Sequence, residues 1–387
     1  MACLVLPPQG RAKGVVTFTT QERDQFINKH VDIRAGITAL KSRYLVGLHH
    51  NWHDTSFRHD PLFDFNLAGE DDLISAEPFP LLPMDACNFA PPVFTPGDEK
   101  FWDVLFVARA VKFKGIPEFF RAIRALYDRG QKLRVLMLCP TPPPSGGAES
   151  GLRALYERLF EPCERQLFSF ITMEWDYPFP LDVPTLAHFY GASRIFVHSA
   201  PDERRCRVAG YAWAAGMPVV GMACVGSVLP TLLRKPPFFF ECQDYGAFPD
   251  AIIAALDNAA GQPDFEPAIV HVSQKTTAGE MVTFLAGLAR EKGHRLSLFP
   301  INARGFDLRL GRHHGLATGF NRLEQDLTAF ITVLKDASDA ELAAFAAADD
   351  PECAIVAHNP LLPRSVIEAR PPSRVLQIAR KIKRALT

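Results

Sequence analysis

The sequence predicts an α/β protein whose central part folds around a parallel, doubly wound sheet. Short apolar runs alternate with amphipathic helical stretches between residues 101 and 292. Asp103–Ala108 is an apolar run suited to a buried strand, and Ile116–Asp128 gathers its apolar side chains on one helix face. Strands of a parallel sheet end at one edge, where ligands of such sheets bind. The loops that follow these strands therefore hold the candidate site residues.

The segments on either side of this central part are less regular. Residues 1–95 contain one well-marked strand, at Tyr44–Leu48, and a Pro- and Phe-rich stretch from Glu77 to Pro96 that we interpret as a linker. We predict a reduced N-terminal domain with this linker at 1–95, a Rossmann-like domain at 96–292 and a helical extension at 293–387. Further strands are expected at Cys3–Leu6, Val15–Phe18, Leu133–Cys139, Phe168–Thr172, Arg194–His198 and Pro218–Met222, and further helices at Gly151–Phe160, Val183–Tyr190, Arg205–Ala215, Ala247–Asn258, Ala278–Glu291, Asn321–Lys335 and Ala340–Ala348.

Composition excludes several classes of protein. The formal net charge is −1, without the basic excess of a nucleic-acid-binding protein. The eight cysteines are scattered and form no C-x-x-C pair, which argues against a zinc site or a disulfide framework. No apolar run reaches the roughly 18–20 residues that span a bilayer, and the first residues lack the apolar core of a signal peptide. A soluble, cytoplasmic protein is expected.

Two cations follow the first strong strand of the central part. Arg109 and Lys114 come after Asp103–Ala108, and Gly115 then precedes a helix. A strand end, fixed cations and a helix N-terminus together form a layout that binds anions. The alternative is a solvated basic loop, and we expect a cation at this position to lie outside the core. The glycine and lysine pattern of a P-loop is absent.

A carboxylate follows a later strand in the same way. Glu203 lies after Arg194–His198 and before the helix predicted at Arg205–Ala215. Such a carboxylate either caps the N–H groups of the helix or accepts hydrogen bonds from sugar hydroxyls. Capping is the commoner role of a lone acid at this position.

Four elements of the chain, in the same order, resemble the signatures of the large retaining family called glycosyl transferases group 1. The resemblance covers about half of the chain, and its strength lies in the order and separation of the elements. The four are Pro83–Phe89, similar to an inter-domain turn; Arg109 with Lys114-Gly115, similar to R-x₄-K-G; Leu186–Val197; and Ser199–Glu203 followed by a helix and Gly216-Met217-Pro218-Val219-Val220.

This resemblance implies a GT-B-like fold with two Rossmann-like domains, in which the reduced domain at 1–95 is the acceptor side and the domain at 96–292 binds a nucleotide-sugar donor. By resemblance, Arg109 and Lys114 neutralise the donor diphosphate, and Glu203 faces the donor sugar. Fixed cations at the leaving diphosphate stabilise its charge in the transition state without a required metal. The implied partners are the donor and a carbohydrate or lipid-linked acceptor.

Two departures from the family pattern concern the donor. The acid with which the family grips the ribose hydroxyls is replaced by Tyr211, and the small residues after the first Glu are replaced by Arg204-Arg205-Cys206-Arg207. Cations there either contact an anionic sugar or phosphate or block the site. The predicted donor contacts are Arg109, Lys114, Glu203, Arg205, Cys206 and Tyr211.

A histidine-rich segment follows the strand at Tyr44–Leu48. His49 resembles the family's functional histidine of the first domain, and we predict a catalytic, acceptor-side role for it. A metal site is the rival interpretation, because imidazoles and carboxylates are suitable ligands, and a polar loop is the third. The segment contains His49, His50, His53, Asp54, His59 and Asp60; a second pair, His313-His314, is more typical of a surface.

The chain ends in a basic amphipathic segment, Ser373–Leu386, which favours either peripheral contact with an anionic membrane or packing on the domain.

The sequence as a whole predicts a metal-independent, retaining glycosyltransferase of the hexosyltransferase type, active in glycan biosynthesis. A non-catalytic sugar-nucleotide-binding relative and an epimerase of the same fold remain as alternatives, since the departures at 204–207 and 211 affect the donor site.

Overall fold

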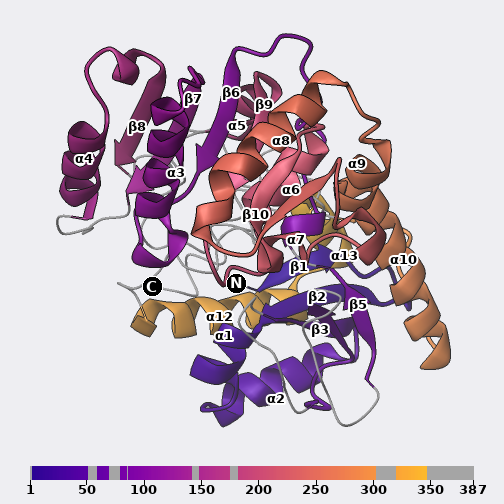
Figure 1. The fold of residues 1–387 in the computed structure, drawn as a ribbon. Coiled ribbons are helices and arrows are strands. Elements are labelled where there is room, and N and C mark those ends of the chain that lie inside the picture. Colours follow the sequence, from indigo (N-terminus) through magenta and orange to yellow (C-terminus); the bar gives the residue numbers. More distant parts are fainter. Residues whose placement is uncertain are drawn as a thin grey trace. The chain divides into compact units, whose positions relative to one another are not determined.

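The computed structural model describes residues 2–50, 59–68, 79–84, 86–141, 148–174, 182–301 and 320–346 (Figure 1). They form two compact units, Met1–Asp85 with Ala278–Thr387, and Ala86–Thr277. The chain thus leaves the first unit and returns to it. The predicted boundaries at 95 and 292 fall inside the second and the first unit, respectively. The units divide within Pro83–Phe89, the segment that resembles an inter-domain turn.

The first unit is built on a five-stranded sheet in the order β1-β2-β3-β4-β5. β1 is antiparallel to β2, and the other neighbouring strands are parallel. Strands β1 to β4 are buried at every residue, which agrees with their mostly apolar sequences. The elements of this part are β1 (Cys3–Leu6), β2 (Gly14–Thr19), α1 (Thr20–Glu22), η1 (Arg23–Ile27), α2 (Val31–Leu40), β3 (Tyr44–His49), β4 (Phe65–Ala68) and β5 (Leu81–Pro83).

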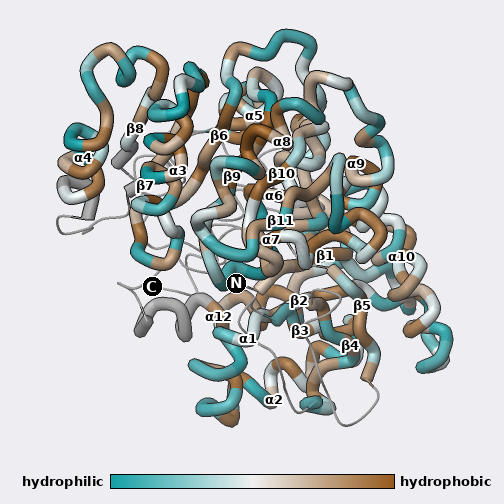
Figure 2. Tube along the Cα trace, in the orientation of Figure 1, coloured by the Kyte–Doolittle hydropathy of each residue, from teal (hydrophilic) through white to brown (hydrophobic). Residues whose placement is uncertain are grey.

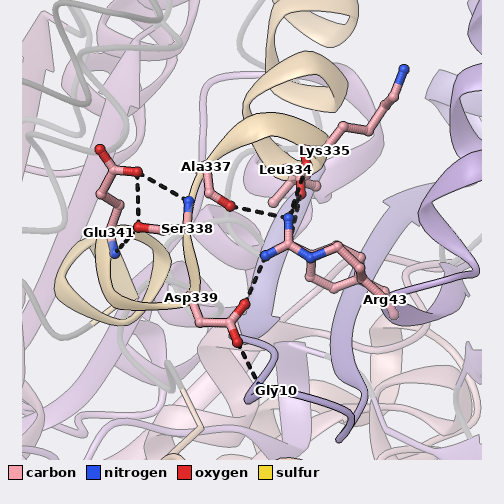
Figure 3. Close-up of polar contacts among 9 residues, drawn as sticks. Gly10, Arg43, Leu334, Lys335, Ala337, Ser338, Asp339 and Glu341 are labelled. Atoms are coloured by element: carbon pink, nitrogen blue, oxygen red, sulfur yellow. Dashed lines mark hydrogen bonds and ion pairs between the residues drawn. The ribbon is translucent and has the colours of Figure 1, made fainter.

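The C-terminal helices α12 (Phe320–Asp336) and α13 (Asp339–Ala346) complete the core of the first unit. Apolar residues of α12 are buried in one cluster with residues of α2 and β3. Figure 3 shows the hydrogen bonds and the ion pair by which Arg43 binds the end of α12 and the start of α13. Its guanidinium donates to the carbonyl groups of Leu334 and Lys335 at 2.9 Å each, and it pairs with Asp339 at 2.7 Å. The described helices of the predicted extension therefore belong to the first unit.

The second unit is built on a six-stranded, wholly parallel sheet in the order β11-β10-β9-β6-β7-β8. Two apolar clusters cover its two faces, and Figure 2 shows hydrophobic residues concentrated on its central strands. The doubly wound prediction is confirmed. The strands are β6 (Trp102–Val107), β7 (Val135–Thr141), β8 (Phe168–Glu174), β9 (Ser193–His198), β10 (Val219–Met222) and β11 (Phe239–Cys242).

The helices of the second unit follow the predicted alternation closely. The amphipathic helix predicted at Ile116–Asp128 has those bounds as α3. The others are α4 (Ala148–Leu159), α5 (Val183–Gly191), α6 (Arg207–Ala214), α7 (Ala223–Gly226), α8 (Phe248–Ala260), α9 (Glu266–Val272) and α10 (Gln274–Glu291), which continues into the first unit, with short turns at η2 (Ala86–Asn88), η3 (Lys112–Lys114), η4 (Glu164–Gln166), η5 (Thr231–Leu233) and η6 (Tyr245–Ala247).

The interpretation of Glu77–Pro96 as a simple linker is wrong. β5 lies within it and pairs with β4, so its first part belongs to the sheet of the first unit. Phe94 is buried in the second unit, where its ring stacks on that of Tyr211 at 4.0 Å. Prolines in this stretch suggested a connection, but β5 ties its first part to the first unit and the buried Phe94 ties its last part to the second.

Candidate functional site

The strand order of the second unit fixes where a ligand can bind. From β6 the chain proceeds to β7 and β8 on one side, and then returns to β9, which pairs with the other side of β6, and on to β10 and β11. β6 and β9 therefore flank the switch point of the sheet. Ligands of doubly wound sheets bind beyond the carboxyl ends of the strands at this point. Arg109 and Lys114 follow β6, and Glu203 follows β9.

Lys114, Glu203 and His198 form a buried polar cluster at this switch point. The Lys114 ammonium forms an ion pair with Glu203 Oε2, and His198 Nε2 lies 2.5 Å from the same oxygen. The Lys114 and Glu203 side chains are only 8% and 15% exposed, and His198 is fully buried. The expectation that a cation at the end of β6 lies outside the core is wrong for Lys114. It is buried because Glu203 neutralises it.

The charges of this cluster follow from its contacts. Burial alone would raise the pKa of Glu203, but its contacts with His198 and Lys114 hold it well below its usual range, so Glu203 is a carboxylate at neutral pH. Burial lowers the pKa of His198 more than Glu203 raises it, which favours the neutral imidazole. A neutral His198 must donate from Nε2 to the carboxylate. Nδ1 is then an acceptor, and among the described residues it has no hydrogen-bond partner.

Glu203 does not cap helix α6. The N-cap of α6 is Cys206, whose side chain makes no capping hydrogen bond. Glu203 binds Lys114 and His198 instead, so the commoner interpretation of a lone acid before a helix does not hold here. The carboxylate is held at the switch point by residues of two strand ends.

The loops after β6 and β9 pack backbone against backbone. Gly115 has φ of +63°, and a Cβ atom there would lie 2.3 Å from the Ser199 carbonyl oxygen. The Ser199 hydroxyl is buried and donates to the Gly115 carbonyl oxygen at 2.7 Å. Only glycine fits both the backbone conformation and the space. This contact sets the position of Lys114 relative to Glu203.

Arg109 lies in the same electrostatic environment. Burial lowers the pKa of its guanidinium, and the Glu203 carboxylate opposes that shift, which places the two groups within interaction range. An arginine keeps its charge throughout the physiological pH range. The structure thus brings together three of the four predicted catalytic residues, Arg109, Lys114 and Glu203.

The predicted donor contacts Arg205 and Cys206 lie in the loop between β9 and α6. Both are buried, and Arg205 adopts a left-handed backbone conformation with φ of +50°. This conformation is uncommon for a residue with a long side chain and costs about 1–3 kcal/mol. Burial strongly raises the pKa of the Cys206 thiol, which favours its protonated form. Arg204 and Arg207, on either side, are half-buried.

Tyr211 lies in the apolar core of the second unit. It is 5% exposed, and its ring stacks on Phe94 and meets Tyr190 edge to face. The Arg207 Nε group donates to its hydroxyl, and the Arg207 guanidinium lies over its ring at 5.3 Å. These contacts favour a packing role over contact with a ribose.

Replacing Tyr211 by Glu is therefore expected to lower the melting temperature without increasing nucleotide affinity, because it buries a charge in an apolar core. Tyr211→Phe keeps the ring and removes only the hydroxyl, so we expect it to cost about 1 kcal/mol or less. Thermal melting and calorimetric titration with a nucleoside diphosphate measure both quantities. Tighter nucleotide binding by a stable Tyr211→Glu variant would contradict the packing role.

Among the described residues, one group could hold a metal ion. The ligand atoms of His198, Glu203 and Cys206 lie within 4.8 Å of one another. The same carboxylate oxygen already pairs with the Lys114 ammonium, which would repel a second cation, and the buried Cys206 thiol favours its protonated form. The residues therefore fit an ion pair better than a metal centre.

The histidine-rich segment lies in the first unit. His49 is buried at the carboxyl end of β3, in register with Thr19 of β2 and Leu67 of β4. His50 Nε2 lies 3.0 Å from Asn66 Oδ1, and both carboxylate oxygens of Asp60 accept from Arg34 at 2.8 Å. Two candidate ligands of the rival metal site, His50 and Asp60, thus already contact Asn66 and Arg34. His53 and Asp54 lie outside the described residues, as do His313-His314 and the segment 373–386.

Sequence reasoning gave no role to His198 and Ser199, which hold Glu203 and Gly115 in place. Each is polar, and each comes at the end of an apolar strand directly before the predicted site. A polar side chain at a strand's carboxyl end is the signal that could have identified them.

No profile of a known protein family matches this chain, and no curated protein matches it. Solved structures to which it is similar include the GtfA/B complex, at 10% identity and a TM-score of 0.45, covering 65% of this chain and 54% of that one. Sucrose-phosphate synthase from Thermosynechococcus elongatus is similar at 16% identity and a TM-score of 0.43, covering 72% of this chain and 74% of that one. A glycosyltransferase from Rickettsia africae is similar at 11% identity and a TM-score of 0.42, covering 67% of this chain and 82% of that one. The chain spans about half the length of the matched chain in the GtfA/B complex. Likenesses of this size carry no residue roles to this chain.

None of the helices in the described part of the chain is both long and apolar enough to cross a bilayer.

Proposed function

We propose that the second unit binds the diphosphate of a nucleotide sugar at the β6–β9 switch point, and that the protein transfers the sugar to an acceptor. One observation carries this proposal. A lysine and a glutamate, buried as an ion pair with an arginine nearby, lie at the carboxyl ends of the two strands that flank the switch point. Buried ionisable groups with a specific charge partner, placed at a ligand-binding edge, are candidates for a functional site.

The chemistry follows from the charges of these residues. The nucleoside diphosphate leaves with rising negative charge, and Arg109 and Lys114 are fixed cations that stabilise this charge. In the protein without ligand, Lys114 is neutralised by Glu203. A phosphate would compete for the ammonium, and Glu203 would then be available to accept a hydrogen bond from a sugar hydroxyl. For His49, at a strand end of the first unit, we propose an acceptor-side role; retention of configuration rests on the sequence resemblance.

Consumption of nucleotide sugars tests the proposed function. Donors with different bases and sugars are incubated with the protein, with and without carbohydrate and lipid-linked acceptors, and the released nucleoside diphosphate is measured. A transferase releases it faster with an acceptor, whereas an epimerase changes the donor sugar without one. If no donor binds or reacts, the proposed function is contradicted.

Transfer is expected to continue in EDTA, because Arg109 and Lys114 supply the positive charge that a metal supplies in other enzymes. The measurement is product formation after dialysis against EDTA, compared with added Mg²⁺ or Mn²⁺. Strict dependence on added metal would contradict this expectation and favour ligands from the His49–Asp60 segment or the His198 cluster.

Membrane contact through Ser373–Leu386 is a further part of the proposal, and it rests on the alternation of basic and apolar residues in that sequence. Deleting 373–387 is expected to release the protein from anionic vesicles, and binding of the intact chain should weaken with salt. Co-sedimentation with vesicles of anionic and of zwitterionic lipid measures this. Equal binding with and without the segment would leave only a packing role.

A further inference from the structure

His198 uses only one of its two ring nitrogens. Its Nε2 lies 2.5 Å from Glu203 Oε2. Its Nδ1 is buried and has no hydrogen-bond partner in the parts of the chain that the structure describes. A buried polar atom without a partner calls for an explanation, because it has lost its contact with water and has no replacement. β9 ends at His198, so this atom lies at the ligand-binding edge of the sheet.

Apolar groups lie next to the imidazole. The rings of Phe106 and Phe196 are nearly parallel to it, and the centroid of each lies 6.2 Å from its own. On the neighbouring strand β10, Gly221 lies in register with His198. None of these neighbours titrates or carries a charge. The charge of His198 therefore responds to side chains from the loops after β6 and β9.

Those loops bring four ionisable side chains to His198 or to its partner. The Glu203 carboxylate pairs with His198 and with the Lys114 ammonium through the same oxygen. The Cys206 sulfur lies within 4.8 Å of the histidine and glutamate ligand atoms, and its thiol is protonated because burial raises its pKa. Arg109 interacts electrostatically with Glu203. In the protein without ligand, the carboxylate is balanced by Lys114, and His198 is neutral.

Binding of a diphosphate would change this balance. The phosphates compete with Glu203 for the Lys114 ammonium, and they bring negative charge close to the carboxylate. Glu203 is only 15% exposed, so it would remain buried with its cation drawn to the ligand. Uptake of a proton lowers the cost of this arrangement. An imidazole accepts a proton about two pH units more readily than a carboxyl group does, which favours His198 over Glu203 as the acceptor.

We propose that His198 takes up a proton when the donor binds: the diphosphate takes the Lys114 ammonium, Nδ1 of His198 accepts one proton from solvent, and the imidazolium replaces Lys114 as the cation of Glu203. The proton returns to solvent when the diphosphate leaves. This inference rests on the proposed function and adds a residue and a proton to it. His198 is a positioning residue, because it acts through Glu203 and keeps that carboxylate ionised beside the sugar.

Affinity for the donor should then increase as the pH falls, because the ligand-bound protein holds one more proton than the free protein. A single linked proton gives at most about tenfold tighter binding for each pH unit. The increase begins near the pKa of His198 in the complex and ends near its pKa in the free protein, which burial lowers. A histidine that only holds Glu203 in place would give no such dependence.

Calorimetric titration of UDP-glucose and of GDP-mannose tests the proton directly. Neither phosphate of a nucleotide sugar titrates near neutral pH, so the ligand itself releases and accepts no proton. Heats measured in buffers of different ionisation enthalpy give the number of protons taken up, which we expect to be a large fraction of one per ligand at about pH 7. Binding without proton uptake would overturn the inference and leave the proposed function intact. If neither ligand binds, both are contradicted.

Two variants assign the proton to His198. Gln at this position can still donate to Glu203 but cannot accept a proton at neutral pH, so in His198→Gln we expect no uptake and an affinity that no longer changes with pH. Glu203→Gln removes the charge that the imidazolium balances and should also abolish uptake. His188→Gln changes an exposed histidine of α5 and should keep the wild-type uptake.

Melting curves show whether each variant is folded, and one folded variant is enough to decide. Proton uptake that persists in a folded His198→Gln protein would place the proton on another group and overturn the inference. Uptake that persists in folded Glu203→Gln would show that the charge of the carboxylate does not drive it, which also overturns the inference. The titrations of the wild type test the inference even if neither variant folds.

Discussion

Replacing Lys114 by Met is expected to lower the free energy of unfolding by about 3–5 kcal/mol, because it leaves the buried Glu203 carboxylate without its cation. Turnover should fall by roughly 10²–10³, the effect of losing one preorganised electrostatic contact. Urea unfolding and steady-state rates with the best donor measure the two effects. Met keeps the apolar stem of the lysine, so loss of packing contributes little.

Two further variants separate stability from activity. The double variant Lys114→Met, Glu203→Gln removes both charges and should recover part of the lost stability, whereas turnover should remain low. Lys132→Met changes an exposed lysine of the same unit and should leave both quantities unchanged. A stable Lys114→Met variant with nearly normal turnover would contradict the assignment of Lys114 to the site.

Replacing Gly115 by Ala is expected to damage both the fold and the site of the second unit. The new Cβ would lie 2.3 Å from the Ser199 carbonyl oxygen, a backbone atom that cannot move without shifting the loop after β9. Because that loop holds Glu203, we expect both the free energy of unfolding and turnover to fall, the former by more than about 2 kcal/mol, the upper part of the cost of a left-handed alanine.

Gly130 provides a matched control for this prediction. It also has a positive φ, +81°, but a Cβ there would meet nothing within 4 Å. Gly130→Ala therefore measures the backbone cost alone, about 1–2 kcal/mol, and should leave turnover unchanged. Equal losses for the two variants would show that the contact with Ser199 has no role of its own.

Strong periodicity made the second unit predictable from sequence. α3 was predicted with its observed bounds because apolar residues recur on one face and Gly115 and Gly130 flank it. The strands β4, β5 and β11, of three or four residues each, were not predicted, whereas β1 and β10, of four residues each, were. The first unit depends on α12, which lies far along the chain, and distant packing of this kind leaves no local pattern.

The site was predictable in its position and only partly in its contacts. Strand ends placed Arg109, Lys114 and Glu203 at one edge, since parallel strands end together. That Lys114 would be buried against Glu203 could not be predicted, because it depends on β6 and β9 being neighbours. Tyr211 shows the converse: its helix was predicted, but the phenylalanine that stacks on it comes from a stretch interpreted as a linker.

Binding of a nucleoside diphosphate to the switch point tests the central claim most directly. Calorimetric titration of UDP and of GDP is made with the wild type, with Arg109→Met and with Arg121→Met, an exposed arginine on α3. We predict that at least one diphosphate binds the wild type, that Arg109→Met weakens it tenfold or more, and that Arg121→Met does not. Binding that is equal in all three proteins, or absent from the wild type, would contradict the assignment of this site.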